Sequence, residues 1–162
     1  MKRIFFSLAP FALLFASVPL SSEPISAATH TIVLEIGAIL GIPKQVVDAL
    51  QIEESGDRKT GAWGDALAVG PVGSDGVRCL GLYQLNPRGL DGLVKDYYPH
   101  KAKYFDVFNP IDNSVVALSY LAALHKKHGT WERALWAYNC GKVVNVPDST
   151  RGYAARIIGK QK

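Results

Sequence analysis

The sequence predicts a mainly α-helical domain with one small β-hairpin. Apolar residues recur at helical spacing in several segments, a glycine-rich stretch with a turn signal interrupts them, and no repeat or linker divides the chain. The 162 residues are 48% hydrophobic and 20% charged, which excludes a disordered chain. Two cysteines are too few for a disulfide-rich scaffold or a four-cysteine zinc site.

The N-terminal segment has the pattern of a secretory signal peptide. Lys2 and Arg3 precede a nearly continuous apolar run over residues 4–20, and Ser26-Ala27-Ala28 offers small residues for cleavage after Ala28. We therefore expect an exported protein of the periplasm or cell envelope, with residues 1–28 removed and residues 29–162 forming the functional domain. The alternative is an uncleaved membrane anchor.

Two helices are expected first in the mature chain. Apolar residues over His30–Leu40 follow helical spacing, and Gly41 is a plausible stop. Pro43 suits the first turn of the next helix, which Gly56 ends. The face of that second helix expected to be buried contains Val46, Val47 and Leu50.

The stretch from Gly61 to Gly81 changes character. It holds six glycines and the turn signal Ser74-Asp75-Gly76, between short apolar runs at Leu67–Val69 and Val77–Leu80. This pattern predicts a β-hairpin or an ordered loop.

Helical signals return after the hairpin. The elements expected are a short helix over Gly89–Tyr97, a connection over His100–Asn109, a long helix from Pro110 to His128, a helix capped by Thr130 and a last helix from about Thr150. The basic residues before Gly129 complement the dipole of the long helix.

Three short segments carry side chains suited to glycan chemistry. Glu53-Glu54-Ser55-Gly56 ends a largely apolar helix, where desolvation would keep a carboxyl group protonated for glycosidic bond cleavage. Gln84, in Gly81-Leu82-Tyr83-Gln84, can bind an N-acetyl group, and Ala137-Tyr138-Asn139-Cys140-Gly141 offers an aromatic ring and an amide. Taken singly, each also fits solvated glutamates or ordinary capping residues.

The order of these segments resembles the lytic transglycosylase domain of the soluble type, which is related to goose-type lysozymes. Gly41-Ile42-Pro43 through Glu54-Ser55 is similar to the first helix and its Glu-Ser pair, and Tyr83 replaces the usual Met of the Gly-Leu-Met-Gln block. Phe108-Asn109-Pro110, Asn113 and Tyr120-Leu121 resemble the next helix, and Ala137-Tyr138-Asn139 the third block. The resemblance covers Ile36 to Tyr153.

The resemblance implies a lysozyme-like helical fold and cleavage of the MurNAc–GlcNAc bond of peptidoglycan, leaving a 1,6-anhydro end. It implies that Glu54 is the single acid/base. The substrate-binding residues carried over by position are Ser55, which would also orient Glu54, Tyr83, Gln84, Tyr138 and Asn139. We expect glycan strands as substrate, no cofactor, metal or nucleic acid, a monomer, and a local task such as clearing wall for an envelope-spanning or secretion machine.

Two other functions stay open at this point. The stretch between Ser55 and Gly81 is longer than is usual in the family and contains Asp65 and Asp75, either of which could direct water as in a hydrolytic lysozyme. Both aspartates also fit simple turn chemistry. The Tyr83 replacement and the altered late motif Pro147-Asp148-Ser149 would also suit a non-catalytic glycan-binding module.

The cysteines fall in two of the three motif segments. If those segments wall one cleft, Cys79 and Cys140 could form a disulfide in an exported protein; the alternative is two separate small buried side chains. His125 and His128 lack a third ligand for a metal in the sequence.

Overall fold

A computed structural model describes residues 24–159 of the chain and confirms the predicted class: helices around one small sheet. The elements are α1 (Ala27–Ile39), α2 (Lys44–Ser55), β1 (Val69–Val72), β2 (Arg78–Leu80), α3 (Pro87–Tyr97), the 3₁₀ turn η1 (Pro99–Lys101), α4 (Pro110–His128), α5 (Trp131–Cys140) and α6 (Asp148–Gly159). Most of the expected signal peptide lies outside the described residues. The expected cleavage point, after Ala28, falls within the first turn of α1.

Capping side chains fix where the helices begin. Asn86, Asn109 and Thr130 each accept a hydrogen bond from a backbone N–H in the first turn of α3, α4 and α5, respectively. Because Asn86 caps α3, that helix starts at Pro87, slightly before the expected Gly89. The expected stop at Gly129 is confirmed, since its φ of 82° is the left-handed conformation that ends α4.

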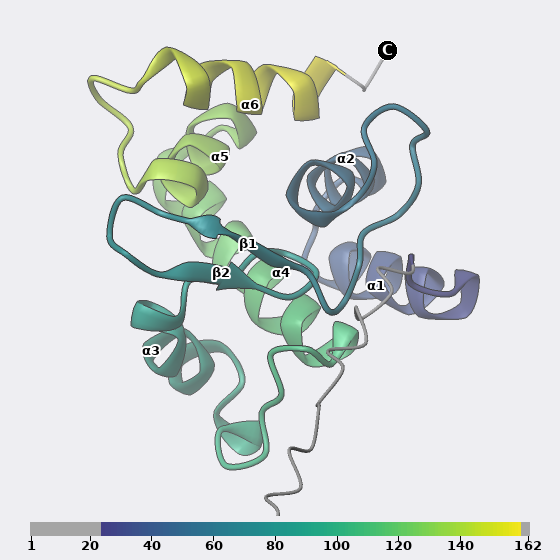
Figure 1. Cartoon of the computed structure of the whole chain (residues 1–162). Coiled ribbons are helices and arrows are strands. Elements are labelled where there is room, and N and C mark those ends of the chain that lie inside the picture. The colour runs from purple at the N-terminus through teal and green to yellow at the C-terminus, as the bar shows by residue number, and fades with distance from the viewer. Residues whose placement is uncertain (1–23, 160–162) are drawn as a thin grey trace, which may run out of the picture.

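Helix α4 forms the centre of the core. It packs against α1, α3 and α5, and its fully buried side chains include Val116, Leu118 and Leu121. Each such side chain contributes about 1.5–3 kcal/mol through removal of apolar surface from water. Helix α6 lies across one end of the molecule (Figure 1) and packs on both α2 and α5. This brings the last helix against the end of α2, where the two glutamates lie.

The β-hairpin is confirmed between α2 and α3. Strands β1 and β2 pair antiparallel, with Val69 opposite Leu80 and Val72 opposite Arg78, and a bulge between the two pairs. In the turn, the Asp75 carboxylate accepts a hydrogen bond from the Val77 N–H at 3.1 Å. The hairpin lies in front of α4 and extends toward the loop between α5 and α6 (Figure 1).

A buried asparagine joins the segment after the hairpin to α4. The Asn113 amide accepts from the Tyr83 N–H at 2.9 Å and donates to the carbonyl groups of Val107 at 2.9 Å and Leu80 at 3.3 Å. Gly81 lies against this amide with φ +75°, and a Cβ there would come within 2.3 Å of both Asn113 Nδ2 and the Val107 carbonyl oxygen. Only glycine satisfies both the conformation and the space.

Within residues 24–159, no helix combines the length and apolar character needed to cross a bilayer.

Candidate active site

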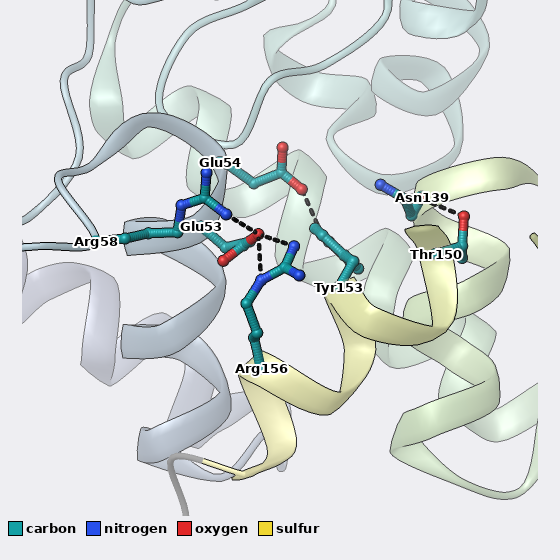
Figure 2. A network of polar contacts seen from close by, with 7 residues as sticks. All are labelled: Glu53, Glu54, Arg58, Asn139, Thr150, Tyr153 and Arg156. Carbon is teal, nitrogen blue, oxygen red and sulfur yellow. Dashed lines mark hydrogen bonds and ion pairs between the residues drawn. The ribbon is translucent and has the colours of Figure 1, made fainter. Parts of the chain in front are cut away.

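Helix α2 ends with two adjacent glutamates whose side chains diverge (Figure 2). Glu53 turns toward Arg58 and Arg156, at 3.3 and 2.5 Å, and its side chain is only 6% exposed. This carboxylate is therefore tied to two guanidinium groups, one of them on α6, and fastens α2 to the last helix.

The Glu54 carboxyl group turns the other way and lines a cleft. Tyr153, on α6, donates a hydrogen bond from its hydroxyl to Glu54 Oε1 (Figure 2). Burial raises the pKa of Glu54 from 4.5 to about 7, the Tyr153 hydrogen bond opposes that rise, and the negative charge of Glu53 adds to it. The raised pKa lets Glu54 hold a proton near neutral pH, as a general acid requires.

Tyr153 is the site residue that sequence reasoning missed. Its side chain is 6% exposed, and burial together with Glu54 raises the pKa of its hydroxyl well above 10, so it remains a donor. It lies on the helix expected from about Thr150, where a Tyr at helical spacing is ordinarily a core residue. Only the packing of α6 on α2 brings it to Glu54.

The cleft has a volume of about 720 Å³. Its walls are the end of α2, the hairpin, the start of α3, α4, and the end of α5. The residues that line it are Glu54, Pro71, Gly73, Cys79, Gln84, Leu85, Asn86, Arg88, Gly89, Leu93, Tyr120, Ala137, Tyr138, Asn139 and Gly141. Among the described residues Glu54 is its single carboxylate and Arg88 its single basic side chain.

The three motif segments meet at this cleft, and hydrogen bonds between them explain how. Ser55 Oγ donates to the Leu82 carbonyl at 2.7 Å, and the Tyr138 hydroxyl donates to the Tyr83 carbonyl at 2.9 Å. Ser55 therefore fixes the end of α2, and with it Glu54, to the Gly-Leu-Tyr-Gln segment. Tyr138 lines the cleft, whereas the Tyr83 side chain is fully buried outside it.

Gln84 and Asn139 line the cleft, and each side-chain amide already uses one of its two polar atoms in hydrogen bonds within the protein. Gln84 has a left-handed backbone, φ 50°, and its Nε2 donates to the carbonyl groups of Gly81 at 2.9 Å and Ala68 at 3.3 Å. Asn139 Oδ1 accepts from the Thr150 hydroxyl at 2.7 Å, and its nitrogen points away from Thr150 (Figure 2). Gln84 thus offers its oxygen, and Asn139 its N–H groups, to a ligand.

Asp65 and Asp75 are not among the residues that line the cleft. Each accepts a hydrogen bond from the backbone N–H two residues later, Asp65 from Leu67 at 2.8 Å and Asp75 from Val77 at 3.1 Å. Asp75 also accepts from Asn86 Nδ2 at 2.8 Å, which holds the hairpin tip against α3. The sequence left open whether these aspartates direct water or stabilise turns. In the structure both stabilise turns through hydrogen bonds to the backbone.

The two cysteines are free thiols in the structure. Cys79 lines the cleft, and burial, Glu54 and Asp75 raise the pKa of its thiol. Cys140 is directed instead to the Lys142 carbonyl, at 3.8 Å. The sequence left open a disulfide or two separate side chains, and the structure has two separate thiols.

His125 is one of the two histidines considered as metal ligands. Its ring stacks on Trp131, with ring centroids 3.8 Å apart.

A family model described as the transglycosylase SLT domain matches residues 33–153. The chain belongs to this family. Neither the curated proteins nor the solved structures gave a match. Membership in the SLT family supports lytic transglycosylase activity on peptidoglycan in general, and the helical fold with its small sheet is consistent with the lysozyme-like architecture. The matched residues include every part of the SLT domain that lines the cleft, from Glu54 to Gly141, as well as Tyr153.

Proposed function

We propose that this SLT domain is a lytic transglycosylase that cleaves the β-1,4 bond between MurNAc and GlcNAc and leaves a 1,6-anhydro-MurNAc end, with Glu54 as acid and base. The observation that carries the proposal is that Glu54 is the one carboxyl group lining the cleft within residues 24–159, with its pKa raised to about 7. A hydrolytic lysozyme of the two-carboxylate type needs a second carboxylate at the substrate.

The reaction uses the two protonation states of Glu54 in turn. The protonated carboxyl group gives its proton to the glycosidic oxygen, the bond from C1 of MurNAc to that oxygen breaks, and the GlcNAc hydroxyl leaves. The carbonyl oxygen of the MurNAc N-acetyl group bonds to C1 meanwhile. The Glu54 carboxylate then takes the proton of the MurNAc 6-hydroxyl, whose oxygen displaces the N-acetyl oxygen at C1. This closes the anhydro ring and returns Glu54 to its protonated state.

The surrounding side chains position this one group. Tyr153 donates to one oxygen of Glu54 and leaves the other to carry the proton. Ser55 acts on Glu54 through the backbone of the Gly-Leu-Tyr-Gln segment, and Tyr83 supports that segment from the core. Gln84, Tyr138 and Asn139 line the cleft where the glycan binds.

The setting belongs to the proposal as well. The protein is exported through its N-terminal signal sequence, acts as a monomer in the periplasm or cell envelope, and opens the wall locally for an envelope-spanning or secretion machine. The basic N-terminus and the apolar run after it support export.

The test is incubation of purified sacculi with the wild-type chain and with Glu54→Gln. We expect anhydro-ended soluble fragments from the wild type and none from Glu54→Gln. Fragments with reducing ends would assign a hydrolase instead, and binding to sacculi without soluble products would assign a glycan-binding module. Glu132→Gln, at an exposed position on α5, is the matched control for loss of a carboxylate.

A further inference from the structure

Arg88 is the one basic side chain that lines the cleft within residues 24–159. It lies in the first turn of α3, lines the cleft, and keeps 66% of its side chain exposed. The other lining residues of the described chain are neutral except Glu54. Since burial lets Glu54 hold a proton near pH 7 and below, Arg88 is then the main charge among the residues that line the cleft.

The guanidinium is held in place beside the Asp75 carboxylate, with most of its N–H donors unused. Arg88 Nη2 donates to the backbone carbonyl of Asp75 at 2.5 Å, whereas Arg88 Nε is 3.9 Å from the Asp75 carboxylate, too far for a hydrogen bond. That carboxylate already accepts from Asn86 and Val77. Within residues 24–159 this is the single hydrogen bond of the Arg88 side chain, and a guanidinium has five N–H donors.

The sugar rings of peptidoglycan give this charge no partner, but their substituents do. MurNAc carries a lactyl group, which bears either its own free carboxylate or a stem peptide with carboxylates further out. An arginine with unused donors matches a carboxylate in a two-point arrangement, which is stronger than a neutral hydrogen bond.

We propose that Arg88 forms a subsite for a carboxylate carried on the lactyl side of MurNAc, whether the lactyl acid itself or a carboxylate of the stem peptide. The inference rests on the proposed function, because it assumes a peptidoglycan strand in the cleft. It adds a specificity that the neutral sugar contacts of Gln84 and Asn139 do not supply.

The test compares Arg88→Gln with Arg133→Gln, which loses the same charge from an exposed position on α5 outside the cleft. The substrates are peptide-bearing oligomers and peptide-free strands, each with its carboxylates free and with those carboxylates amidated. We expect Arg88→Gln to raise KM roughly tenfold for the substrates that carry the carboxylate Arg88 recognises. The value of kcat should change less than about twofold. This rise in KM should largely vanish for the amidated form of the same substrate. A larger rise in KM on peptide-free strands identifies the lactyl acid as the recognised group. A larger rise on peptide-bearing oligomers identifies a carboxylate of the stem peptide.

A second variant guards against a merely loosened hairpin. Asp75→Asn removes the negative charge 3.9 Å from the guanidinium and keeps a side-chain oxygen for the Val77 N–H, but it gives up the hydrogen bond from Asn86 and so also loosens the hairpin tip. It should lower KM for substrates with carboxylates, opposite in sign to Arg88→Gln. Equal KM values in the wild type for the free and amidated forms of both substrates, the peptide-bearing oligomers and the peptide-free strands, would overturn the subsite.

Failure of the proposed function gives a different result. If the wild type releases no product, binding of the free and amidated oligomers to the wild type is measured by calorimetry, and a preference for the free form that Arg88→Gln abolishes upholds the subsite alone. Anhydro products with no preference reject the subsite alone.

Discussion

The Tyr153 hydroxyl donates a hydrogen bond to Glu54, although 99 residues of sequence separate the two side chains. The bond joins α6 to α2 beside the Glu53 ion pairs with Arg58 and Arg156 (Figure 2). Two adjacent glutamates thus have different tasks. Glu53 is bound to cations and holds the two helices together, whereas Glu54 is desolvated and kept able to exchange a proton.

Removal of the Tyr153 hydroxyl should change the pH profile of the reaction. The hydrogen bond lowers the pKa of Glu54, so Tyr153→Phe should raise that pKa above about 7. The decline of kcat/KM at alkaline pH should move to higher pH, with a loss of roughly tenfold or more at the optimum because Glu54 is no longer oriented. Release of soluble fragments from sacculi between pH 5 and 9 measures both effects. Tyr104→Phe, at a residue 70% exposed, serves as the control, and an unshifted profile would contradict the role of Tyr153.

Glu54 should make the fold less stable as the pH rises. Its pKa is raised on folding from 4.5 to about 7, so the folded state binds the proton more tightly than the unfolded chain. Stability is therefore lost between pH 4.5 and 7, by roughly 3 kcal/mol. Glu54→Gln cannot ionise and should be more stable than the wild type at pH 8, with little difference near pH 4. Urea unfolding at both pH values checks this, and a destabilised Glu54→Gln at pH 8 would show that Glu54 is not buried as described.

Gly81 should tolerate no side chain. An added Cβ would lie 2.3 Å from Asn113 Nδ2 and from the Val107 carbonyl oxygen, in a left-handed backbone. We expect Gly81→Ala to lower the free energy of unfolding by roughly 3 kcal/mol or more and to displace the neighbouring Gln84. Gly76→Ala is the matched control, since Gly76 has φ +79° but open space around it, and should cost about 1 kcal/mol. Similar midpoints for the two variants in thermal unfolding would contradict the close packing at Gly81.

The residues just before α1 should contribute to stability. Ser26 caps α1, Ile25 is 8% exposed, and the Ile25 N–H donates to the Gly64 carbonyl at 3.0 Å. A chain beginning at Thr29 should therefore be less stable than one beginning at Pro24, by roughly 2–4 kcal/mol, from loss of the cap and of one buried side chain. Denaturant unfolding of the two chains gives the difference. Equal stability would show that processing at Ala28 leaves the fold intact.

Local signals in the sequence were sufficient for most of the secondary structure. Thr130 caps α5 and Gly129 ends α4 as expected, because capping depends on residues within one turn. The hairpin follows from its turn residues, where Asp75 accepts from the backbone, and Asp65 does the same in the loop before β1. The family resemblance is confirmed over residues 33–153. The roles given to Glu54, Ser55, Tyr83, Gln84, Tyr138 and Asn139 stay predictions, for which the structure supplies positions.

The helical class, the order of the motif segments and the choice of Glu54 as the residue to examine all follow from the sequence alone. Tertiary structure decided what surrounds that residue. Tyr153 reaches Glu54 only because α6 packs on α2, and Arg88 lies between the cleft and Asp75 only because the hairpin tip folds back onto the start of α3. The physical reason is that desolvation and hydrogen bonding across a cleft depend on groups far apart in the chain, whereas helix periodicity and capping are local.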